Sequence, residues 1–516
     1  MKKSLIACAA MAAALTATSV EARWLRAETD SFIIYSESGE KPLREFAENL
    51  QRFDNTLRVL LDIQEQGEEN RLPIYLLPSA GDVSRLATGS SGGSIAGLYV
   101  PARDGSFALS HRENDGATRG TSGPQQVLFH EYSHHFMKRY VTAAFPAWFI
   151  EGFAEYYSTV DFDKDGKAEI GSPVYRRAYG LLQMPKIPVE KLLFETPGAM
   201  RDGGQADVYY GRAWALTHML YHHPPRAGQF GAYTKAINSG TDPRQAATDA
   251  FGDLAQLDKD LNRYIQGKLA YRLTRDPIPV PATISVTPLS PGEDAVMELR
   301  LERMTARGNA VRTTRVRDQL RALAATHAGD AAVNYELAAA EWAMGDDVRD
   351  TAAVRAALGR ALAARPDHVR ANVLLGRLNL DALDEKGEAS AEAWREARRP
   401  IQLANRTDPD DPVPLYEYFR SFVEQDGRPT DMAIKALERA FVLAPENIEL
   451  RITYAFALAN RGEFDPALKL AKSVAFDPHD NGQGEKLLAS LENMRVRHAL
   501  RESVERDEES DAAAGE

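Results

Sequence analysis

Two stretches determine the fold that we expect for the N-terminal half of this chain: residues 124–140, PQQVLFHEYSHHFMKRY, and residues 146–157, PAWFIEGFAEYY. In each stretch a proline stands where a helix can begin, and apolar residues follow on nearly all sides of the expected helix. A helix that is apolar all round is buried, so the sequence predicts two buried helices in succession. Their ionisable residues are the unusual feature, because burying such groups without partners costs free energy.

The run HEYSH at residues 130–134 predicts a metal site. His130 and His134 are four residues apart, so a helix places both imidazoles on one face, where they can share one ion. Zinc accepts imidazole nitrogen, and in catalytic sites it takes three protein ligands and a water. Glu131 is the expected general base, which would take a proton from that water and pass it to the leaving amine.

The run EGFAE at residues 151–155 follows, with sixteen residues between His134 and Glu151. The pairing of the two runs resembles the gluzincins, zinc peptidases whose third ligand is a glutamate one helix downstream in an E-G-x-A-E-like run. This resemblance implies that Glu151 is the third zinc ligand and that the chain is a metallopeptidase. More loosely, residues 24–272 resemble bacterial peptidase-MA-like domains. The specificity motif of the aminopeptidase branch is not found, so aminopeptidase activity is not implied.

Two neighbouring residues have open roles. Glu155 lies one turn beyond Glu151, where a buried carboxylate could accept a hydrogen bond from the non-ligating nitrogen of His130 or His134. The alternative is a surface carboxylate near the helix end. His135 faces elsewhere on its helix and is expected to be a core or surface histidine rather than a ligand.

A gluzincin also needs a hydrogen-bond donor for the oxyanion that develops on the substrate carbonyl. Tyr210, Trp214 and His218 stand at i, i+4 and i+8 and so form one stripe of an expected helix. We expect Tyr210 to be the donor, with Tyr209 and His218 as competitors. The alternative is that the stripe only packs in the core.

The run DFDKDG at residues 161–166 has the spacing of a calcium-binding loop. Its twelfth position is Ser172, where such loops need a bidentate glutamate. The Asp165-Gly166 pair between extended runs is also typical of a hairpin turn, and the hairpin is the favoured interpretation.

The N-terminal residues indicate export. Two lysines, an apolar run over residues 4–17 and a small-residue pattern ending at Ala22 predict a secretory signal peptide over residues 1–22. The run is too short for a membrane anchor. A lipoprotein attached through Cys8, the only cysteine, is disfavoured because only seven residues precede it. We therefore expect a periplasmic or secreted protein.

Composition limits the partners. The formal net charge of the 516 residues is −12, which argues against nucleic acid or an anionic membrane surface as a ligand. No later segment is long and apolar enough to predict a stable membrane span. The expected partners are a peptide or protein substrate and a protein partner of the C-terminal half.

Strand-like and helical patterns place the domains. Residues 23–275 are expected to form an α+β zincin-like catalytic domain with a small mixed sheet. A proline-rich connector then opens a linker with a short β-like segment, residues 276–310. Residues 311–500 show helical periodicity throughout, and residues 501–516 form an acidic tail expected to be disordered. In the first domain the expected strands are 31–35, 72–77, 98–101 and 106–110, and the expected helices are 42–63, 124–140, 146–157, 174–182, 208–222, 230–237 and 257–272.

The C-terminal half contains weak repeats. Prolines at 366, 409, 445 and 478 follow successive helix pairs. Before the first stand Val354, Leu358 and Ala361, and Ala433, Leu437 and Ala440 stand at the same offsets before the third. These positions resemble the second helix of a tetratricopeptide (TPR) repeat, and an irregular helical bundle is the alternative.

The sequence thus predicts an exported zinc-dependent metallohydrolase, with peptide hydrolysis as the leading activity and an all-α TPR-like domain for protein interaction or substrate guidance. One alternative is a TPR-type interaction protein whose metal domain is structural or vestigial. An intact Glu131 counts against it, because a structural zinc site needs no base. Another alternative is zinc-dependent hydrolysis of a different bond, such as a cell-wall crosslink. The segment 98–101 is a candidate edge strand for pairing with an extended peptide, and the loop rich in glycine and serine before it is a candidate rim.

Overall fold

The computed structural model describes most of the chain, namely residues 24–92, 95–113, 122–141, 143–200, 203–280, 284–306, 308–384, 390–477 and 482–514. The expected signal peptide, with Cys8 and the cleavage site at Ala22, lies outside the described residues. The described chain mixes helices and strands as far as Pro288 and is helical from Pro291 onward. In the part described, no helix is both long and apolar enough to cross a membrane.

A six-stranded mixed sheet forms the centre of the molecule, with strand order β4-β5-β3-β2-β1-β9. The inner strands β5, β3 and β2 are parallel, whereas β4, β1 and β9 each pair antiparallel with their neighbours. The expected strands are all present. The bounds are β1 Leu25–Glu28, β2 Phe32–Ser36, β3 Leu72–Leu77, β4 Leu98–Val100, β5 Phe107–His111 and β9 Ser285–Pro288.

The two faces of this sheet are buried by different helices. Phe32, Ile34 and Ile74 point to one face, which packs against α1 (Glu40–Leu60) and α3 (Gly123–Tyr140). Tyr75 and Phe107 point to the other face, which packs against α2 (Ala80–Thr88) and α11 (Pro291–Thr305). Covering both faces explains why β3 and β5 are buried along nearly their whole length instead of alternating between buried and exposed residues.

The helix α2 was not predicted, although its signals are present. Ser79 caps it by accepting a hydrogen bond from the backbone N–H of Asp82, whose side chain accepts one from the N–H of Ser79 in return. Gly89 ends it in the left-handed conformation, with φ of 85°. The helix has nine residues, so its apolar periodicity is too brief to stand out from the neighbouring strands.

Behind α3, the chain forms a group of helices that completes the first domain. The buried helix α4 (Ala147–Ser158) packs against both α3 and α7 (Gly203–His222). A second sheet, of order β6-β7-β8, lies beside them. The helix expected over 257–272 ends at Ile265. The remaining elements are β6 Asp161–Phe162, β7 Ala168–Ile170, β8 Arg272–Leu273, α5 Ala178–Gln183, α6 Val189–Phe194, α8 Gln229–Asn238, α9 Pro243–Phe251 and α10 Leu254–Ile265, with 3-10 turns at Tyr175–Arg177, Pro197–Ala199 and Pro224–Arg226.

The second half of the chain is a succession of helix pairs. Consecutive helices pack as α13 with α14, α15 with α16, α17 with α18, and α19 with α20. Val354, Leu358 and Ala361 on α14 are fully buried, and so are the three matching residues on α18, as expected for contact positions of a repeated unit. The bounds are α12 Ala310–Thr326, α13 Ala331–Trp342, α14 Thr351–Ala364, α15 Val369–Asp384, α16 Ala391–Thr407, α17 Pro412–Asp426, α18 Asp431–Leu443, α19 Ile448–Asn460, α20 Phe464–Ala475 and α21 Gln483–Ala514.

The structure adds detail to two expectations. The short β-like segment expected within residues 276–310 corresponds to β9, which pairs with β1, and α11 then covers the same sheet. The tail expected to be disordered is helical as far as Ala514, in continuation of α21. Alanine, glutamate and arginine, which dominate residues 501–514, are strong helix formers even where no apolar face requires a helix.

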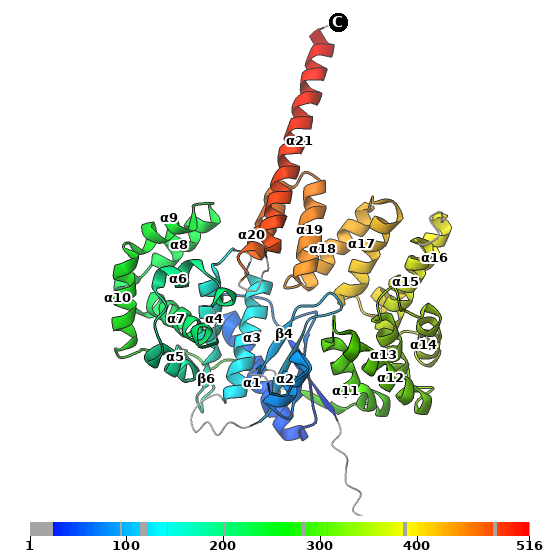
Figure 1. Cartoon of the computed structure of the whole chain (residues 1–516), viewed down its shortest axis with the longest axis horizontal. Coiled ribbons are helices and arrows are strands. Elements are labelled where there is room, and N and C mark those ends of the chain that lie inside the picture. The colour runs from blue at the N-terminus through cyan, green and yellow to red at the C-terminus, as the bar shows by residue number, and fades with distance from the viewer. Residues whose placement is uncertain are drawn as a thin grey trace, which may run out of the picture.

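The helical region curves around the sheet and touches the first domain at several points (Figure 1). Arg312 donates to the carbonyl of Leu86 at one end of this arc, over 3.0 Å. At the other end Arg451 donates to the carbonyl of Lys138 in the last turn of α3, over 2.7 Å. Figure 1 shows α21 projecting away from the rest of the molecule.

Candidate metal centre

Three buried side chains converge where α3 meets α4. The Nε2 atoms of His130 and His134 are 3.2 Å apart. One carboxylate oxygen of Glu151, Oε2, lies 3.5 Å from His130 Nε2 and 3.3 Å from His134 Nε2. The three atoms therefore form an almost equilateral triangle, and Glu151 is fully buried. These are the three residues that the sequence predicted as metal ligands, and the structure brings them together.

The position of Glu151 depends on a close contact between α4 and α7. A Cβ atom added to Gly152 would lie 2.2 Å from Thr217 Oγ1 and 2.5 Å from the carbonyl oxygen of Ala213. Only glycine therefore lets α4 approach α7 this closely. The glycine in the run EGFAE thus has a packing reason, because it sets the depth at which the neighbouring carboxylate meets the two histidines.

The chemistry of the three donors fits a metal ion. Two neutral imidazoles whose Nε2 atoms face each other can place at most one N–H between them. At least one Nε2 lone pair and the carboxylate of Glu151 therefore point at the same space. A cation at the centre of the triangle satisfies all three atoms. Within the described residues, His130, His134 and Glu151 are the only such group of histidine, cysteine, aspartate or glutamate side chains close enough together to hold a metal ion.

No protein-family model matches the chain, and a search of curated proteins finds no match either. The donor atoms and their distances are the observations that describe the centre.

Glu155 lies behind the centre. Its side chain is fully buried, so the alternative of a surface carboxylate is wrong. Its Oε1 lies 3.4 Å from Nδ1 of His130, the ring nitrogen that faces away from the triangle. A carboxylate in this position can hold the imidazole in the orientation and tautomer that ligation by Nε2 needs.

Two arginines that sequence reasoning missed keep Glu155 charged. Arg176 Nη2 lies 2.8 Å from one carboxylate oxygen, and Arg177 Nη2 lies 2.7 Å from the other. Burial by itself would raise the pKa of Glu155, but the charges of Arg176 and Arg177, and then of His130, outweigh burial and lower the pKa to about 2. The sequence offered only an indirect signal for these two arginines. A buried glutamate in EGFAE requires cationic partners, and an arginine pair follows it in the chain.

Glu131 is on α3 between the two histidines but is not part of the triangle. Its side chain is only partly buried, unlike the three donors. A Cβ atom added to Gly97, just before β4, would lie 3.7 Å from Glu131 Cγ. Glu131 therefore lies close to the segment that leads into the edge strand β4, and its side chain is partly accessible to solvent.

Tyr210 on α7 lies beside the centre. Its ring centroid is 6.2 Å from that of His130, and the guanidinium of Arg177 lies over the Tyr210 ring, 4.7 Å from the centroid. Burial raises the pKa of Tyr210, and the charge of Glu151 raises it further against the opposing charge of Arg177. The phenol therefore keeps its proton at neutral pH and is available as a donor.

The two competitors of Tyr210 have structural partners. The hydroxyl of Tyr209 donates to the carbonyl of Glu195 over 2.9 Å, within the core. Both ring nitrogens of His218 are within hydrogen-bond distance of other groups, Nδ1 of the Tyr264 hydroxyl at 2.8 Å and Nε2 of the Gly171 carbonyl at 2.9 Å. The aromatic stripe of α7 therefore packs in the core at its C-terminal end and reaches the centre only at Tyr210.

The remaining candidates have other roles. His135 is buried with Nδ1 at 3.0 Å from the Tyr99 hydroxyl and Nε2 at 3.4 Å from Glu68, so it is a core histidine. The run at 161–166 is a hairpin, in which β6 and β7 pair antiparallel. The Oδ1 atom of Asp163 accepts from the backbone N–H groups of Asp165 and Lys167, both at 2.9 Å, which closes the turn without a cation.

Proposed function

We propose that this chain is an exported zinc-dependent metallohydrolase that cleaves peptide bonds, with His130, His134 and Glu151 as the zinc ligands. The observation that carries the proposal is the triangle of donor atoms with sides of 3.2, 3.3 and 3.5 Å. A tetrahedral ion with bonds of about 2.0–2.1 Å separates its ligand atoms by about 3.3–3.4 Å, which matches these sides. Export is inferred from residues 1–22 alone.

The donor types favour zinc over the other common divalent cations. Calcium and magnesium prefer shells of oxygen atoms, whereas this centre offers two imidazole nitrogens and one carboxylate. Three protein ligands, rather than four, are typical of catalytic zinc sites. The charge also suits a catalytic ion, since Glu151 supplies one negative charge and leaves the centre net positive.

The surrounding residues suit hydrolysis of an amide. When bound, zinc supplies Lewis acidity, which polarises a carbonyl and lowers the pKa of water. Glu131 accepts the proton of the attacking water and passes it to the leaving nitrogen, so that the amine departs neutral. The Tyr210 hydroxyl donates a hydrogen bond to the substrate oxygen as it gains negative charge. Glu155 holds the Nδ1 side of His130, and Arg176 and Arg177 hold Glu155.

The edge strand favours a peptide as the substrate. β4 is the outermost strand on its side of the sheet, and the segment before it lies against Glu131. An extended chain that adds to β4 by backbone hydrogen bonds would pass the general base with its amide groups aligned. Together with the two runs that resemble gluzincins, this arrangement supports a zincin-like peptidase domain followed by TPR-like repeats.

Metal analysis combined with cleavage of a peptide library tests the proposal. We expect one zinc ion per chain. We also expect cleavage of the library to stop when a chelator is added and to return when zinc is restored. Cleavage that persists in the chelator, or a protein that binds no zinc, would contradict the proposal. One zinc per chain without cleavage of any peptide would favour the interaction protein with a structural metal domain.

A further inference from the structure

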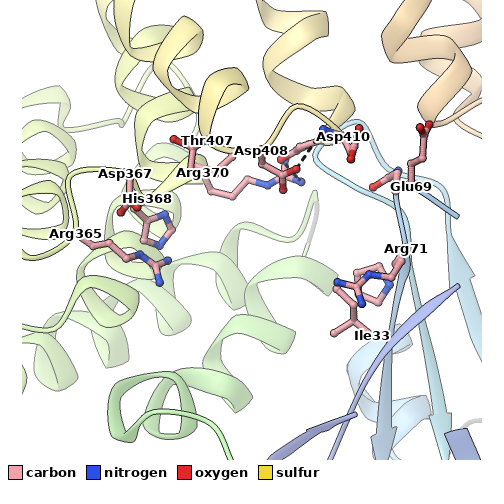
Figure 2. Close-up of a pocket in the computed structure, with 14 residues that line it drawn as sticks. Ile33, Glu69, Arg71, Arg365, Asp367, His368, Arg370, Thr407, Asp408 and Asp410 are labelled. Carbon is pink, nitrogen blue, oxygen red and sulfur yellow. Dashed lines mark hydrogen bonds and ion pairs between the residues drawn. The ribbon is translucent and has the colours of Figure 1, made fainter. Parts of the chain in front are cut away.

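The helical region and the first domain touch at a few places and stand apart elsewhere. A cavity of about 640 Å³ lies between them, and Figure 2 shows residues of its two sides facing one another. The sheet side includes Ile33 of β2, and the helical side includes Arg365 and His368, which lie between α14 and α15. Direct contacts between the two regions are therefore local, and one group of them is made by the turn between α18 and α19.

The turn between α18 and α19 comprises residues 444–447, and we call it the docking turn. Ala444, Glu446 and Asn447 are each at most 3% exposed. Connections between helices usually run over the surface, because polar groups that are buried need hydrogen-bond partners. The partners of Glu446 and Asn447 come from two elements of the first domain, the β4–β5 hairpin and α3.

The docking turn holds the loop between β4 and β5 at both of its ends. Just after β4, the carbonyl oxygen of Ala102 accepts a hydrogen bond from Asn447 Nδ2 over 2.9 Å. Just before β5, the hydroxyl of Ser106 donates to Oε1 of Glu446 over 3.2 Å. Because β4 and β5 also pair with each other, these two contacts fix the hairpin as one unit.

The docking turn also holds the C-terminal end of α3. The second carboxylate oxygen of Glu446, Oε2, lies 3.3 Å from Nη1 of Arg139, and both side chains are at most 9% exposed. Arg139 also donates to the carbonyl of Leu443, the last residue of α18, over 2.7 Å. A single carboxylate thus joins the hairpin to the helix that carries His130 and His134.

A direct link joins the same two elements. The hydroxyl of Tyr99, in the middle of β4, lies 3.0 Å from Nδ1 of His135 on α3. Burial, and then the negative charge of Glu446, hold the pKa of Tyr99 well above its usual value, so the hydroxyl keeps its proton and can donate to the ring. The edge strand β4 is therefore fixed to α3 directly and, through the docking turn, a second time.

We infer that the docking turn positions the edge strand: it sets the spacing between β4 and α3, and with it the place where an extended substrate lies relative to Glu131. Glu446 and Asn447 are positioning residues, since they act through the hairpin and α3. The inference rests on the proposed function, in which the substrate adds to β4. The helical region is then a required part of the peptidase, because small displacements of a bound substrate from its general base are costly.

Asn447→Ser breaks the link to the hairpin and keeps the helix that follows the docking turn. Asn447 also caps α19, since its Oδ1 accepts from the backbone N–H of Leu450 at 3.1 Å, and serine is an equally good cap. The shorter serine side chain loses the contact with Ala102. Asn309→Ser is the matched control, because Asn309 caps α12 in the same way, over 3.0 Å, and is exposed.

Two substrates give the measurement, a cleaved peptide of about eight residues and the shortest form of the same peptide that is still cleaved. Asn447→Ser should lower kcat/KM for the long peptide about five-fold, mainly through a higher KM, because pairing along β4 stabilises substrate and transition state alike. The short peptide has few backbone groups that can pair with β4, so its KM and kcat should be unchanged. Bound zinc should stay at the wild-type ratio, and Asn309→Ser should change neither peptide's kinetics.

Ser106→Ala tests the same link from the hairpin side, with the docking turn intact. It removes the hydrogen bond to Glu446, and it should also raise KM for the long peptide and leave the short peptide unaffected. Agreement between this variant and Asn447→Ser would exclude an effect of either substitution on the folding of its own segment.

Four results would overturn the inference. Unchanged KM for the long peptide in both variants would leave the docking turn with a structural role only. Equal losses for the long and the short peptide, or a loss of zinc, would show a general effect on the centre. In each of these cases the wild type still cleaves peptides, and the proposed function stands. If the wild type cleaves no peptide, the proposed function fails and the inference fails with it.

Discussion

The helix α3 carries two histidine environments within one turn, and the difference between them shows how a candidate metal ligand can be told from a core histidine. His135 has a separate partner for each ring nitrogen, the hydroxyl of Tyr99 and the carboxylate of Glu68. His130 and His134 instead direct Nε2 atoms at one point that Glu151 also faces. All three histidines are buried to a similar degree, so burial alone does not separate the two environments.

The distinction lies in how the donors and acceptors match. Around His135 a donor meets an acceptor at each contact, and no further group is needed. Around His130 and His134 acceptors face acceptors, which is stable in a buried place only if a cation or protons stand between them. The convergence of acceptors, rather than the presence of histidine, is therefore the mark of the metal centre.

The largest effect should come from the proposed general base. Glu131→Gln keeps the shape of the side chain and all three ligands but cannot take a proton, so kcat should fall by about 100- to 10,000-fold. Bound zinc, measured by metal analysis, should stay at the wild-type ratio. Full activity in this variant would show that Glu131 does not handle the proton.

Substituting the neighbouring histidines one at a time tests the comparison most directly. His134→Ala removes one of three ligands, and zinc affinity should fall by roughly 100- to 1,000-fold, on the order of 3–4 kcal/mol per ligand. His135→Ala should leave zinc affinity unchanged and lower the free energy of unfolding by about 1–3 kcal/mol, through the hydrogen bonds lost with Tyr99 and Glu68. Chelator competition and denaturant unfolding measure the two effects. Loss of zinc in both variants would contradict the comparison.

The tyrosine pair on α7 gives a similar test of catalysis. Tyr210→Phe removes the expected oxyanion donor and should lower kcat about 100-fold with little change in KM. Tyr209→Phe is the control, since its hydroxyl donates to the Glu195 carbonyl and not to the centre. It should cost about 1 kcal/mol of stability and leave kcat unchanged. Equal effects of the two substitutions on kcat would remove Tyr210 from the mechanism.

The smallest effect should come from the carboxylate behind His130. Glu155→Gln should lower zinc affinity about 10- to 100-fold, because the Nδ1 side of His130 loses its charged acceptor. Glu336→Gln is a matched control, because Glu336 is also buried and also held by two arginines, but lies in the helical region. Both variants should lose stability, and only Glu155→Gln should lose zinc affinity. If both variants lost zinc affinity, the loss in Glu155→Gln would follow from lower stability and not from the missing contact with His130.

Sequence reasoning placed the centre because its signals are local. The four-residue spacing of His130 and His134 determines their relative position on any helix, and the distance along the chain to Glu151 suffices for a second helix to fold back. The central strands and the repeat positions Val354, Leu358 and Ala361 were likewise predicted by short-range patterns. Each of these depends on residues within about one or two turns of one another.

Contacts between distant segments were not predictable in the same way. The arginines that hold Glu155 lie on a short 3-10 turn whose sequence gives no sign of what it faces. The pairing of β9 with β1 joins residues about 260 positions apart, from Leu25 to Pro288. The proline-rich segment before β9 has the composition of a linker, yet the apolar face of the sheet draws α11 back onto it.

The contact between the helical region and the end of α3 affects how the molecule unfolds. The last carbonyl groups of a helix lack partners within it, and here Arg451 supplies one for Lys138 while Arg139 donates to Leu443. The helix that carries His130 and His134 is thus completed by residues more than 300 positions further along the chain. Thermal unfolding monitored by calorimetry should therefore show one cooperative transition, and bound zinc should raise its midpoint temperature. A fragment truncated before α18 should lose secondary structure in α3 as well as the missing repeats.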